Sequence, residues 1–254
     1  MTRFVRYAVD GGARYGVIEG DVVVDLDGPP WDDPGRGEEL PLEAVRLLAP
    51  CAPRKVLAVG RNYRSHLGDR DVPSEPGLFV KLPTSIIGPG EDIVLPPDAT
   101  EVHAEGELVV VIGTTARRVA PERAARHVFG VTAGNDVSER RWQREDLQWL
   151  RAKGSDTFGP LGPAIATGLD AGDLELRTRV DGDVVQLAST RELIFPIEEI
   201  VSWASRYVTL EPGDAIFTGT PGRTSALRSG SVVEIELEGV GTLENRVRMA
   251  PPLP

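Results

Sequence analysis

The chain of 254 residues contains a single cysteine, Cys51, and therefore cannot form an internal disulfide. This is typical of proteins from a reducing compartment, and we expect a cytoplasmic protein. No apolar stretch reaches the ~20 residues that a membrane-spanning helix needs, and the first ten residues lack the apolar core of a signal peptide. The sequence therefore predicts no membrane partner.

Basic residues are scarce relative to acidic ones: 28 Lys and Arg stand against 39 Asp and Glu, for a formal net charge of −11. Nucleic-acid binding rests on clustered Lys and Arg that contact phosphates, so this balance argues against a nucleic-acid partner. A small anionic substrate remains compatible, because basic residues can dominate the field inside one pocket. Basic residues do crowd one part of the chain: Arg140, Arg141, Arg144, Arg151 and Lys153.

Several familiar catalytic motifs are missing. There is no Gly-x-Ser-x-Gly elbow, which argues against a serine hydrolase of the α/β class. Residues 219–225 superficially resemble a phosphate-binding loop but lack its Gly-Lys-Ser/Thr ending, and no dinucleotide fingerprint follows a predicted strand. The acidic residues are therefore the main candidates for chemistry.

The 28 glycines and 21 prolines predict many turns between short strands. Residues 2–26 alternate like a small antiparallel unit, and residues 38–48 show a helical pattern. We place a domain boundary after residue 52, which gives a small N-terminal domain, 1–52, and a larger domain, 53–254. The larger domain is predicted to contain hairpins at 180–184 and 237–243 and helices over 138–150 and 196–208. This mixture predicts a β-rich α+β fold.

Glu105 and Glu107 stand one residue apart at the start of the most apolar run of the chain, which continues to Ile112. The run is short, rich in β-branched residues and bounded by Gly113, so it predicts a strand buried on both faces. Side chains two residues apart on a strand point the same way, so both glutamates project together. Two unpaired buried carboxylates are costly, and a bound metal or a cationic partner is therefore predicted here.

A third carboxylate, Asp136, ends another apolar segment, residues 128–136, at a predicted strand-to-helix junction. This position suits a helix cap as well as a metal ligand, and both interpretations stay open. His103 shares the strand face of Glu105 and Glu107. A histidine-plus-carboxylate set for Zn²⁺ or Fe²⁺ is therefore a second hypothesis for this region.

His66 is one of three histidines and follows a predicted strand over residues 55–59. Asp69 lies three residues later and shares the face of His66 if the segment is helical. A carboxylate in that position can orient and charge an imidazole. The pair is a candidate for acid–base catalysis, against the plainer interpretation that a lone histidine is structural or solvated.

Five motifs resemble those of the fumarylacetoacetate hydrolase family in their order and approximate spacing. They are Gly60-Arg-Asn-Tyr-x-x-His66, Glu105-x-Glu107-Leu, Asn135-Asp136-Val-Ser, Arg151-Ala-Lys-Gly-Ser-Asp-Thr-Phe158 and Thr218-Gly-Thr-Pro-Gly222. The match covers roughly residues 55–250 and is similar to bacterial two-part members of the acylpyruvase and 2-hydroxyhepta-2,4-diene-1,7-dioate isomerase type. The resemblance implies a mixed β-sheet or β-roll catalytic domain behind a small N-terminal α/β unit.

The resemblance also implies a metal site. Glu105, Glu107 and Asp136 correspond to the ligands of a divalent ion, usually Mg²⁺, with Mn²⁺ or Ca²⁺ as substitutes. Three carboxylates on such an ion leave one excess negative charge. Lys153 matches the family lysine that provides the positive charge needed for an anionic keto acid.

Family members act on pyruvyl or β-diketo acids. The resemblance therefore implies a hydrolase that cleaves a C–C bond of an acylpyruvate or fumarylpyruvate through an enolate at the metal. In hydrolytic members a histidine and an acid, here His66 and Asp69, activate water. The remaining implied site residues are Gln143 and Lys153 for catalysis, and Arg61, Tyr63, Arg140, Lys153 and Thr220 for substrate binding. The resemblance also favours a homodimer.

One departure leaves the reaction open. The acid partner is a glutamate in many members, whereas Asp69 is one methylene shorter, and Asp71 and Glu75 are nearby substitutes. The enzymatic alternative is a decarboxylase, or an isomerase or tautomerase, of an oxaloacetate- or hydroxymuconate-type acid. These reactions need enolate stabilisation but no nucleophilic water. A non-catalytic metal-binding protein with the same fold is the alternative of another class.

Overall fold

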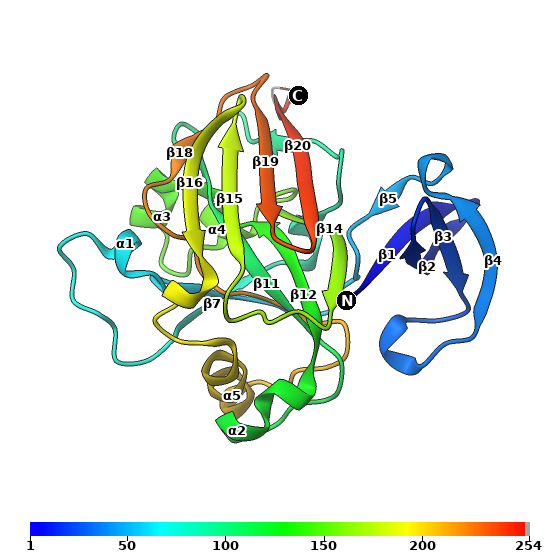
Figure 1. The fold of residues 1–254 in the computed structure, drawn as a ribbon. Helices are drawn as coiled ribbons and strands as arrows, with labels where there is room; N and C mark the ends of the chain where they lie inside the picture. Colours follow the sequence, from blue (N-terminus) through cyan, green and yellow to red (C-terminus); the bar gives the residue numbers. More distant parts are fainter. Residues whose placement is uncertain (252–254) are drawn as a thin grey trace.

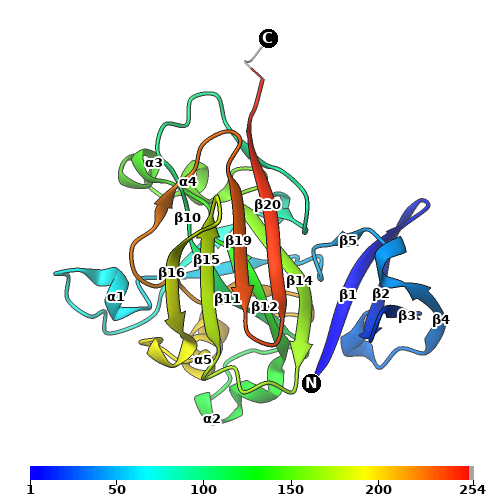
Figure 2. The same cartoon turned by 45° about the horizontal axis from the view of Figure 1, so that its top comes forward.

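The computed structural model describes residues 1–251 and consists of three β-sheets and a few short helices (Figures 1 and 2). The predicted β-rich α+β class is confirmed. No helix within residues 1–251 is long and apolar enough to cross a membrane.

The N-terminal strands form an antiparallel meander, which lies to one side of the main body in Figure 1. They are β1 (Thr2–Val9), β2 (Gly12–Glu19), β3 (Val22–Leu26) and β4 (Arg36–Pro41), and the short β5 (Leu47–Leu48) pairs with β1. β1 also pairs with β14 (Gly159–Thr167), with Phe4 opposite Ile165. One sheet therefore runs across the predicted domain boundary.

The predicted helix over residues 38–48 is wrong. These residues form β4, a single 3-10 turn (Leu42–Ala44) and β5. Pro41 lies in the middle of the segment and has no N–H for an intrahelical bond, so it opposes a helix there. Residues 36–41 instead pair with β3, with Leu40 opposite Val23.

The centre of the large sheet contains strands that are buried on both faces. Its strands beyond β14 are, in order, β12 (Val128–Asn135), β11 (Gly106–Ile112), β17 (Ala215–Phe217), β6 (Val56–Gly60) and β7 (Gly77–Lys81), and β8 (Ile86–Ile87) pairs with β14. Every residue of β11 is buried, as predicted for a strand covered on both faces. Leu108 and Val110 face the main core, and Val109 and Val111 face a second core behind the sheet.

A five-stranded sheet packs face to face on the large sheet (Figure 2). Its strands are β16 (Asp183–Ser189), β15 (Glu175–Val180), β19 (Val232–Leu237), β20 (Gly241–Met249) and β9 (Ile93–Leu95). A small third sheet contains β13 (Ser138–Glu139), β10 (Val102–Ala104) and β18 (Ser225–Ala226). Both predicted hairpins are present, as β15–β16 and β19–β20.

The helices are few and short. They are α1 (Arg64–Leu67), α2 (Pro121–Ala124), α3 (Arg140–Glu145), α4 (Leu150–Gly154) and α5 (Ile197–Tyr207), with further 3-10 turns at Pro30–Asp32, Pro83–Ser85, Ala125–His127 and Thr190–Glu192. The helix predicted over 196–208 is α5, which buries Ile200, Val201 and Ala204 at helical spacing.

The helix predicted over residues 138–150 is interrupted. Its first residues form β13, and two short helices, α3 and α4, follow. Between these helices Trp149 has a φ of 56°, in the left-handed region that ends helical runs. The Asp146 carboxylate accepts the Arg151 N–H at 3.2 Å and so restarts the helix in a new direction. The turn brings Arg140 of α3 and Lys153 of α4 to the same cleft.

Candidate active site

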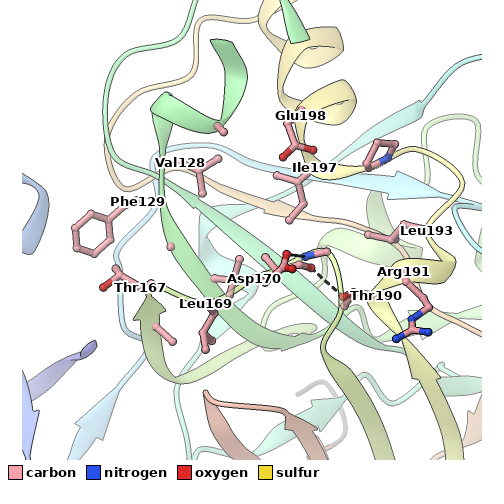
Figure 3. Close-up of a pocket in the computed structure, with 18 residues that line it drawn as sticks. Val128, Phe129, Thr167, Leu169, Asp170, Thr190, Arg191, Leu193, Ile197 and Glu198 are labelled. Atoms are coloured by element: carbon pink, nitrogen blue, oxygen red, sulfur yellow. Dashed lines mark hydrogen bonds between the residues drawn. The ribbon is translucent and has the colours of Figure 1, made fainter. Parts of the chain in front are cut away.

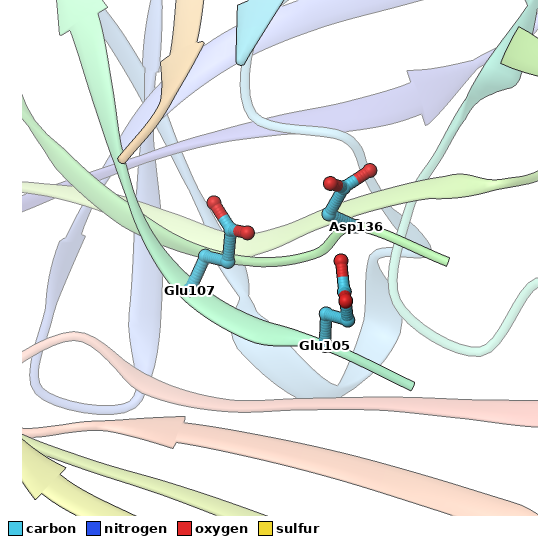
Figure 4. Close-up of side chains that lie close together, drawn as sticks. All are labelled: Glu105, Glu107 and Asp136. Carbon is cyan, nitrogen blue, oxygen red and sulfur yellow. The ribbon is translucent and has the colours of Figure 1, made fainter. Parts of the chain in front are cut away.

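Three carboxylates meet where β11 and β12 lie side by side (Figure 4). Glu105 immediately precedes β11, Glu107 is its second residue, and Asp136 follows β12. The Asp136 N–H donates to the Glu105 carbonyl, and the Glu105 N–H donates to the Asn135 side chain, both at 2.9 Å. One oxygen of each carboxylate lies within 4.8 Å of the other two, although all three side chains are buried. The structure thus brings together the three residues predicted to hold a metal.

Cationic side chains contact two of these carboxylates. The buried Lys153 ammonium donates to Glu105 Oε2 at 2.7 Å and to Asp136 Oδ2 at 2.5 Å. Lys81, which is also buried, donates to Asp136 Oδ1 at 2.6 Å and to the Lys153 carbonyl at 2.5 Å. The Arg140 guanidinium donates to Glu105 Oε1. Glu105 and Asp136 are therefore each held by two cations.

Glu107 differs from the other two carboxylates. It makes no ion pair within residues 1–251, and its Oε2 accepts the Gly219 N–H at 2.7 Å. Burial, with the negative charges of Asp136 and Glu105 beside it, raises the pKa of Glu107 well above its usual range. Burial acts the same way on Glu105, but the positive charges of Lys153 and Arg140 together outweigh it and hold the pKa of Glu105 below its usual value. Glu107 is thus the carboxyl that lacks a compensating positive charge.

The two buried lysines have opposite pKa shifts. Burial lowers the pKa of Lys81, and the charge of Asp136 opposes this only in part. Lys153 has a raised pKa, because Asp136 and Glu105 together outweigh burial. With Arg140, three cations face three carboxylates, so the cluster is close to neutral before any ion binds. Lys153 is therefore not the only source of the positive charge expected beside the carboxylates, because Lys81 and Arg140 contribute as well.

The cluster fits a divalent cation. Carboxylate oxygens are hard donors of the kind that Mg²⁺, Mn²⁺ and Ca²⁺ prefer. Among the described residues Glu107 Oε1 has no hydrogen-bond partner, and the charge of this side chain is uncompensated. Glu105, Glu107 and Asp136 would hold such an ion, and the metal would give Glu107 the positively charged partner that the protein does not supply.

The carboxylates open into a cleft of about 510 Å³. The predicted site residues that line it are Arg61, His66, Glu105, Glu107, Asp136, Arg140, Gln143, Lys153 and Thr220. Two predicted site residues, Tyr63 and Asp69, lie outside its wall. The cleft also contains Arg70 and Arg144, so basic residues are concentrated here despite the negative net charge of the chain.

The proposed pairing of His66 with Asp69 is not formed. Helix α1 ends at Leu67, and Gly68 follows with a φ of 61°, so the chain turns away before Asp69. Asp69 is exposed. The His66 ring instead bonds through Nδ1 to the Gly222 carbonyl at 2.7 Å. The suggested substitutes Asp71 and Glu75 are likewise exposed and do not line the cleft.

Tyr63 was predicted to contact substrate, but the structure places it inside the protein. Its side chain is fully buried, and its hydroxyl has no hydrogen-bond partner in the described part of the chain. Burial and the nearby charges of Glu107 and Glu192 raise the pKa of Tyr63. Tyr63 therefore supports the site from within rather than forming its wall.

Sequence reasoning missed three residues of the site. Lys81 ends β7 and is completely buried, and a lysine that closes an apolar strand just before a Leu-Pro turn was a usable signal. Phe79 and Trp149 line the cleft with ring centroids 5.3 Å apart, and the Lys153 ammonium lies 5.0 Å from the Phe79 ring centroid. Trp149 had no sequence signal, because its position depends on the left-handed turn between α3 and α4.

His103 does not join the carboxylates. It lies on β10 in the small sheet, and its Nδ1 is 2.8 Å from the Thr224 hydroxyl. Burial and the nearby Arg140 lower its pKa. Within residues 1–251 the only cluster suited to a metal is formed by carboxylates without His103, so the Zn²⁺ or Fe²⁺ hypothesis is not supported.

A second cavity, of about 420 Å³, lies at the opposite end of β12 beside the start of α5 (Figure 3). Its lining includes the aliphatic side chains of Val128, Leu169, Leu193 and Ile197. The charged residues among its lining are exposed to solvent: Asp170, Arg191 and Glu198. This cavity lacks the buried charges that mark the first one.

Comparison with known proteins agrees with this geometry. Residues 55–248 match the model of the fumarylacetoacetate (FAA) hydrolase C-terminal family, and residues 2–50 match the Rv2993c-like N-terminal family. The chain belongs to the fumarylacetoacetate hydrolase family. The first match covers the strands and helices that carry the carboxylates, the lysines and His66.

Individual members of this family that resemble the chain carry names of different reactions. Human oxaloacetate tautomerase FAHD2A, mitochondrial, is 42% identical over 223 residues, 82% of this chain and 71% of the relative. The structure of a 5-carboxymethyl-2-hydroxymuconate delta-isomerase from Mycobacterium smegmatis is 47% identical, with a TM-score of 0.93 over 98% of this chain and 100% of the other. A maleylpyruvate hydrolase from Sphingobium sp. SYK-6, in complex with manganese(II) and pyruvate, is 30% identical, with a TM-score of 0.81 over 98% and 100%. These fumarylacetoacetate hydrolase family relatives are isomerases, tautomerases and hydrolases.

Proposed function

We propose that this protein is a metal-dependent isomerase or tautomerase of a small anionic keto acid. The observation that carries the proposal is the environment of His66. Its ring lines the same cleft as the buried carboxylates and bonds to a backbone carbonyl, and within residues 1–251 no carboxylate forms a hydrogen bond with it. Proton transfer on the substrate needs only one such base, whereas hydrolysis also needs an activated water.

The charges of the cleft support an anionic substrate. Glu105 and Asp136 are already paired with Lys153, Lys81 and Arg140, so a divalent ion would leave two excess positive charges. A keto acid brings one negative charge on its carboxylate and develops a second on its 2-oxo oxygen as the neighbouring carbon loses a proton. The metal would act as a Lewis acid that stabilises this developing charge.

His66 is suited to carry the proton. A carbonyl oxygen can only accept, so Nδ1 carries the hydrogen in the bond to Gly222. In the neutral ring Nε2 is then unprotonated and can take a proton from the substrate and return it to another position. The Gly222 carbonyl fixes the tautomer and orients the ring, and this orienting part is the role that the sequence predicted for Asp69.

Other residues of the cleft are suited to orient the substrate. One guanidinium nitrogen of Arg140 contacts Glu105, and another donates to Gln143 Oε1 at 2.8 Å. This bond turns the amide of Gln143 so that its NH₂ group is available to a substrate oxygen. Gln143 and Lys153 thereby offer donors on the side of the cleft where the carboxylates lie.

Absorbance and product analysis would test the proposal. The purified protein, loaded with Mg²⁺ or Mn²⁺, is mixed with enol oxaloacetate and with hydroxymuconate-type acids. We expect the enol absorbance to change without release of pyruvate, and His66→Ala to lower this rate by at least about 100-fold. A rate that is unchanged in His66→Ala would contradict the assigned role of the histidine.

Hydrolysis of an acylpyruvate is the second candidate, favoured by the similarity to the maleylpyruvate hydrolase whose structure contains manganese(II) and pyruvate. In that case a mixture with maleylpyruvate or another acylpyruvate consumes one water and releases pyruvate together with a second carboxylic acid, and an assay coupled to NADH oxidation detects the pyruvate. Release of both products at the rate of substrate loss would replace isomerisation by C–C hydrolysis as the activity, whereas pyruvate and CO₂ from oxaloacetate would indicate decarboxylation. Lack of turnover of every acid in the panel with either metal would favour a non-catalytic role.

A further inference from the structure

Gln186 is a buried residue outside all five sequence motifs, yet it contacts two of them. It lies on β16 in the five-stranded sheet and is 4% exposed. Its Oε1 accepts the Gly106 N–H at 3.0 Å. Its Nε2 donates to Thr220 Oγ1 at 2.8 Å and to the Pro221 carbonyl at 2.6 Å. One amide therefore connects the peptide between the two glutamate ligands with the loop that passes over them.

These bonds fix the direction of the Thr220 hydroxyl. A backbone N–H can only donate, so Oε1 of Gln186 must face Gly106, and Nε2 must face Thr220. Because Thr220 Oγ1 receives a hydrogen there, its own hydrogen goes to the Gly106 carbonyl, at 2.9 Å. The donor of Thr220 is therefore in use, and one lone pair remains for the cleft that Thr220 lines.

We propose that Gln186 is a positioning residue that makes Thr220 a hydrogen-bond acceptor toward the cleft. Thr220 then binds a donor, which is the enol hydroxyl of the substrate or a water that solvates it, and not a carboxylate oxygen. This inference rests on the proposed function, since the enol is a species of that reaction. A threonine hydroxyl can in general donate or accept a hydrogen bond, and the bonds described above leave Thr220 an acceptor toward the cleft.

Gln186 also affects residues beyond Thr220, because it holds the loop formed by residues 219–222. Gly219 donates to Glu107, and the Gly222 carbonyl holds His66, so residues 219–222 contact both a predicted ligand and the proposed base. Gln186 binds the two residues between these contacts. Gly106, to which Gln186 binds on the carboxylate strand, is tightly packed, because a Cβ added there would lie 2.0 Å from Thr178 Oγ1. Gln186 thus fixes the spacing between the carboxylate strand and the loop.

Four single variants and one double variant would test the proposal. Gln186→Leu removes all three bonds of the amide, and Thr220→Val removes the acceptor. Gln186→Glu keeps the size of the side chain and an acceptor for Gly106, and its ionised carboxylate cannot donate to Thr220, so this variant is measured at a pH high enough to ionise it. Thr178→Val is the matched control, because this buried hydroxyl beside Gly106 has no hydrogen-bond partner in the described chain.

We expect Gln186→Leu, Gln186→Glu and Thr220→Val each to lower kcat by about tenfold or more, with KM changed by less than about threefold. The double variant Gln186→Leu/Thr220→Val should be no slower than the slower single variant, because both changes remove the same interaction. Thr178→Val should retain the wild-type kcat. Multiplicative losses in the double variant, or a wild-type kcat for Gln186→Glu, would overturn the proposal.

Amide hydrogen exchange of the substrate-free protein separates this inference from the proposed function. Gln186→Leu should speed exchange at the amides of Gly106, Gly219, Thr220 and Gly222, and Thr178→Val should not. If the wild-type protein turns over none of the keto acids, the proposed function fails, and exchange still decides whether Gln186 holds the loop. Unchanged exchange in Gln186→Leu would overturn the positioning role whatever the activity.

Discussion

The two cavities at opposite ends of β12 have similar volumes, about 510 Å³ and about 420 Å³, but their side chains differ in kind. At the Asn135 end, carboxylates and lysines are buried together. At the Val128 end, the aliphatic side chains of Val128, Leu169, Leu193 and Ile197 line the cavity together with small and polar residues, and the charged side chains are exposed. The same strand therefore joins a centre of buried charges, called the polar end below, to a cavity without buried charges, called the apolar end after these four side chains.

The difference shows that volume alone does not identify a functional site. Burying charged groups costs stability even when they are paired, so a sequence tends to keep them where function uses them. The polar end holds a buried carboxyl, Glu107, that forms no ion pair with a residue of the described chain. The apolar end contains no buried charged side chain among its lining residues. The contrast can be tested by changing the charges at one end and the volume at the other.

The largest effect is expected for Glu107→Gln. The variant removes the uncompensated charge, so Mn²⁺ affinity measured by titration calorimetry should fall by more than about 100-fold, and activity should be lost. Thermal stability in EDTA should stay about equal, because the raised pKa of Glu107 favours its neutral carboxyl in the metal-free protein, and the amide that replaces it is neutral too and keeps an oxygen for the Gly219 N–H. Glu198→Gln at the apolar end is the control and should change neither quantity. Retained Mn²⁺ affinity in Glu107→Gln would remove Glu107 from the metal site.

The next effect concerns Lys81→Met. This change leaves Asp136 with one cationic partner, and breaking a buried ion pair costs roughly 3–5 kcal/mol of unfolding free energy. Urea unfolding in EDTA measures this loss. The control Arg248→Met breaks an exposed pair with Asp92, for which we expect a loss below about 1 kcal/mol. Equal losses of unfolding free energy in the two variants would mean that burial does not increase the cost of breaking the Lys81–Asp136 ion pair.

The sequence predicted the polar end better than its surroundings. Glu105, Glu107 and the strand after them combine a strict two-residue period with a continuous apolar run, and both features are local. The three predicted ligands therefore converge in the structure. Lys81 was not predicted as a site residue, because it lies on a strand at the edge of the sheet and only the tertiary fold places it next to Asp136.

One local prediction failed, and one residue of the site was not predicted, for physical reasons that sequence patterns do not contain. The pairing of His66 with Asp69 required a helix that continues, but α1 stops at Leu67 and Gly68 redirects the chain. Gln186 had no motif at all, because its function depends on a β16 side chain that reaches a different sheet. Contacts between distant segments are thus the part of the site that one sequence does not specify.

A smaller, pH-dependent effect should distinguish the polar end further. The pKa of Glu107 is raised in the metal-free protein, and a cation binds its ionised form. Ion binding should therefore release protons, and Mn²⁺ affinity should rise with pH until Glu107 is ionised before the ion arrives. Calorimetric titrations at about pH 6 and about pH 8, in buffers with different ionisation enthalpies, measure the proton release. Equal affinity and no proton release at both values would contradict an unpaired, protonated Glu107.

The smallest effect is expected from adding one methylene at each end. Val128→Ile places it in the apolar cavity, where it should raise the unfolding free energy by up to about 1 kcal/mol and leave kcat within about twofold. Val59→Ile makes the same change behind the wall of the polar cleft, where Val59 packs in the main core, so the extra group should strain this wall and lower kcat/KM. Urea unfolding and steady-state kinetics give both quantities for both variants. If Val128→Ile lowered kcat as much as Val59→Ile, β12 would transmit strain from one end to the other, and the apolar cavity would have to be treated as part of the catalytic apparatus.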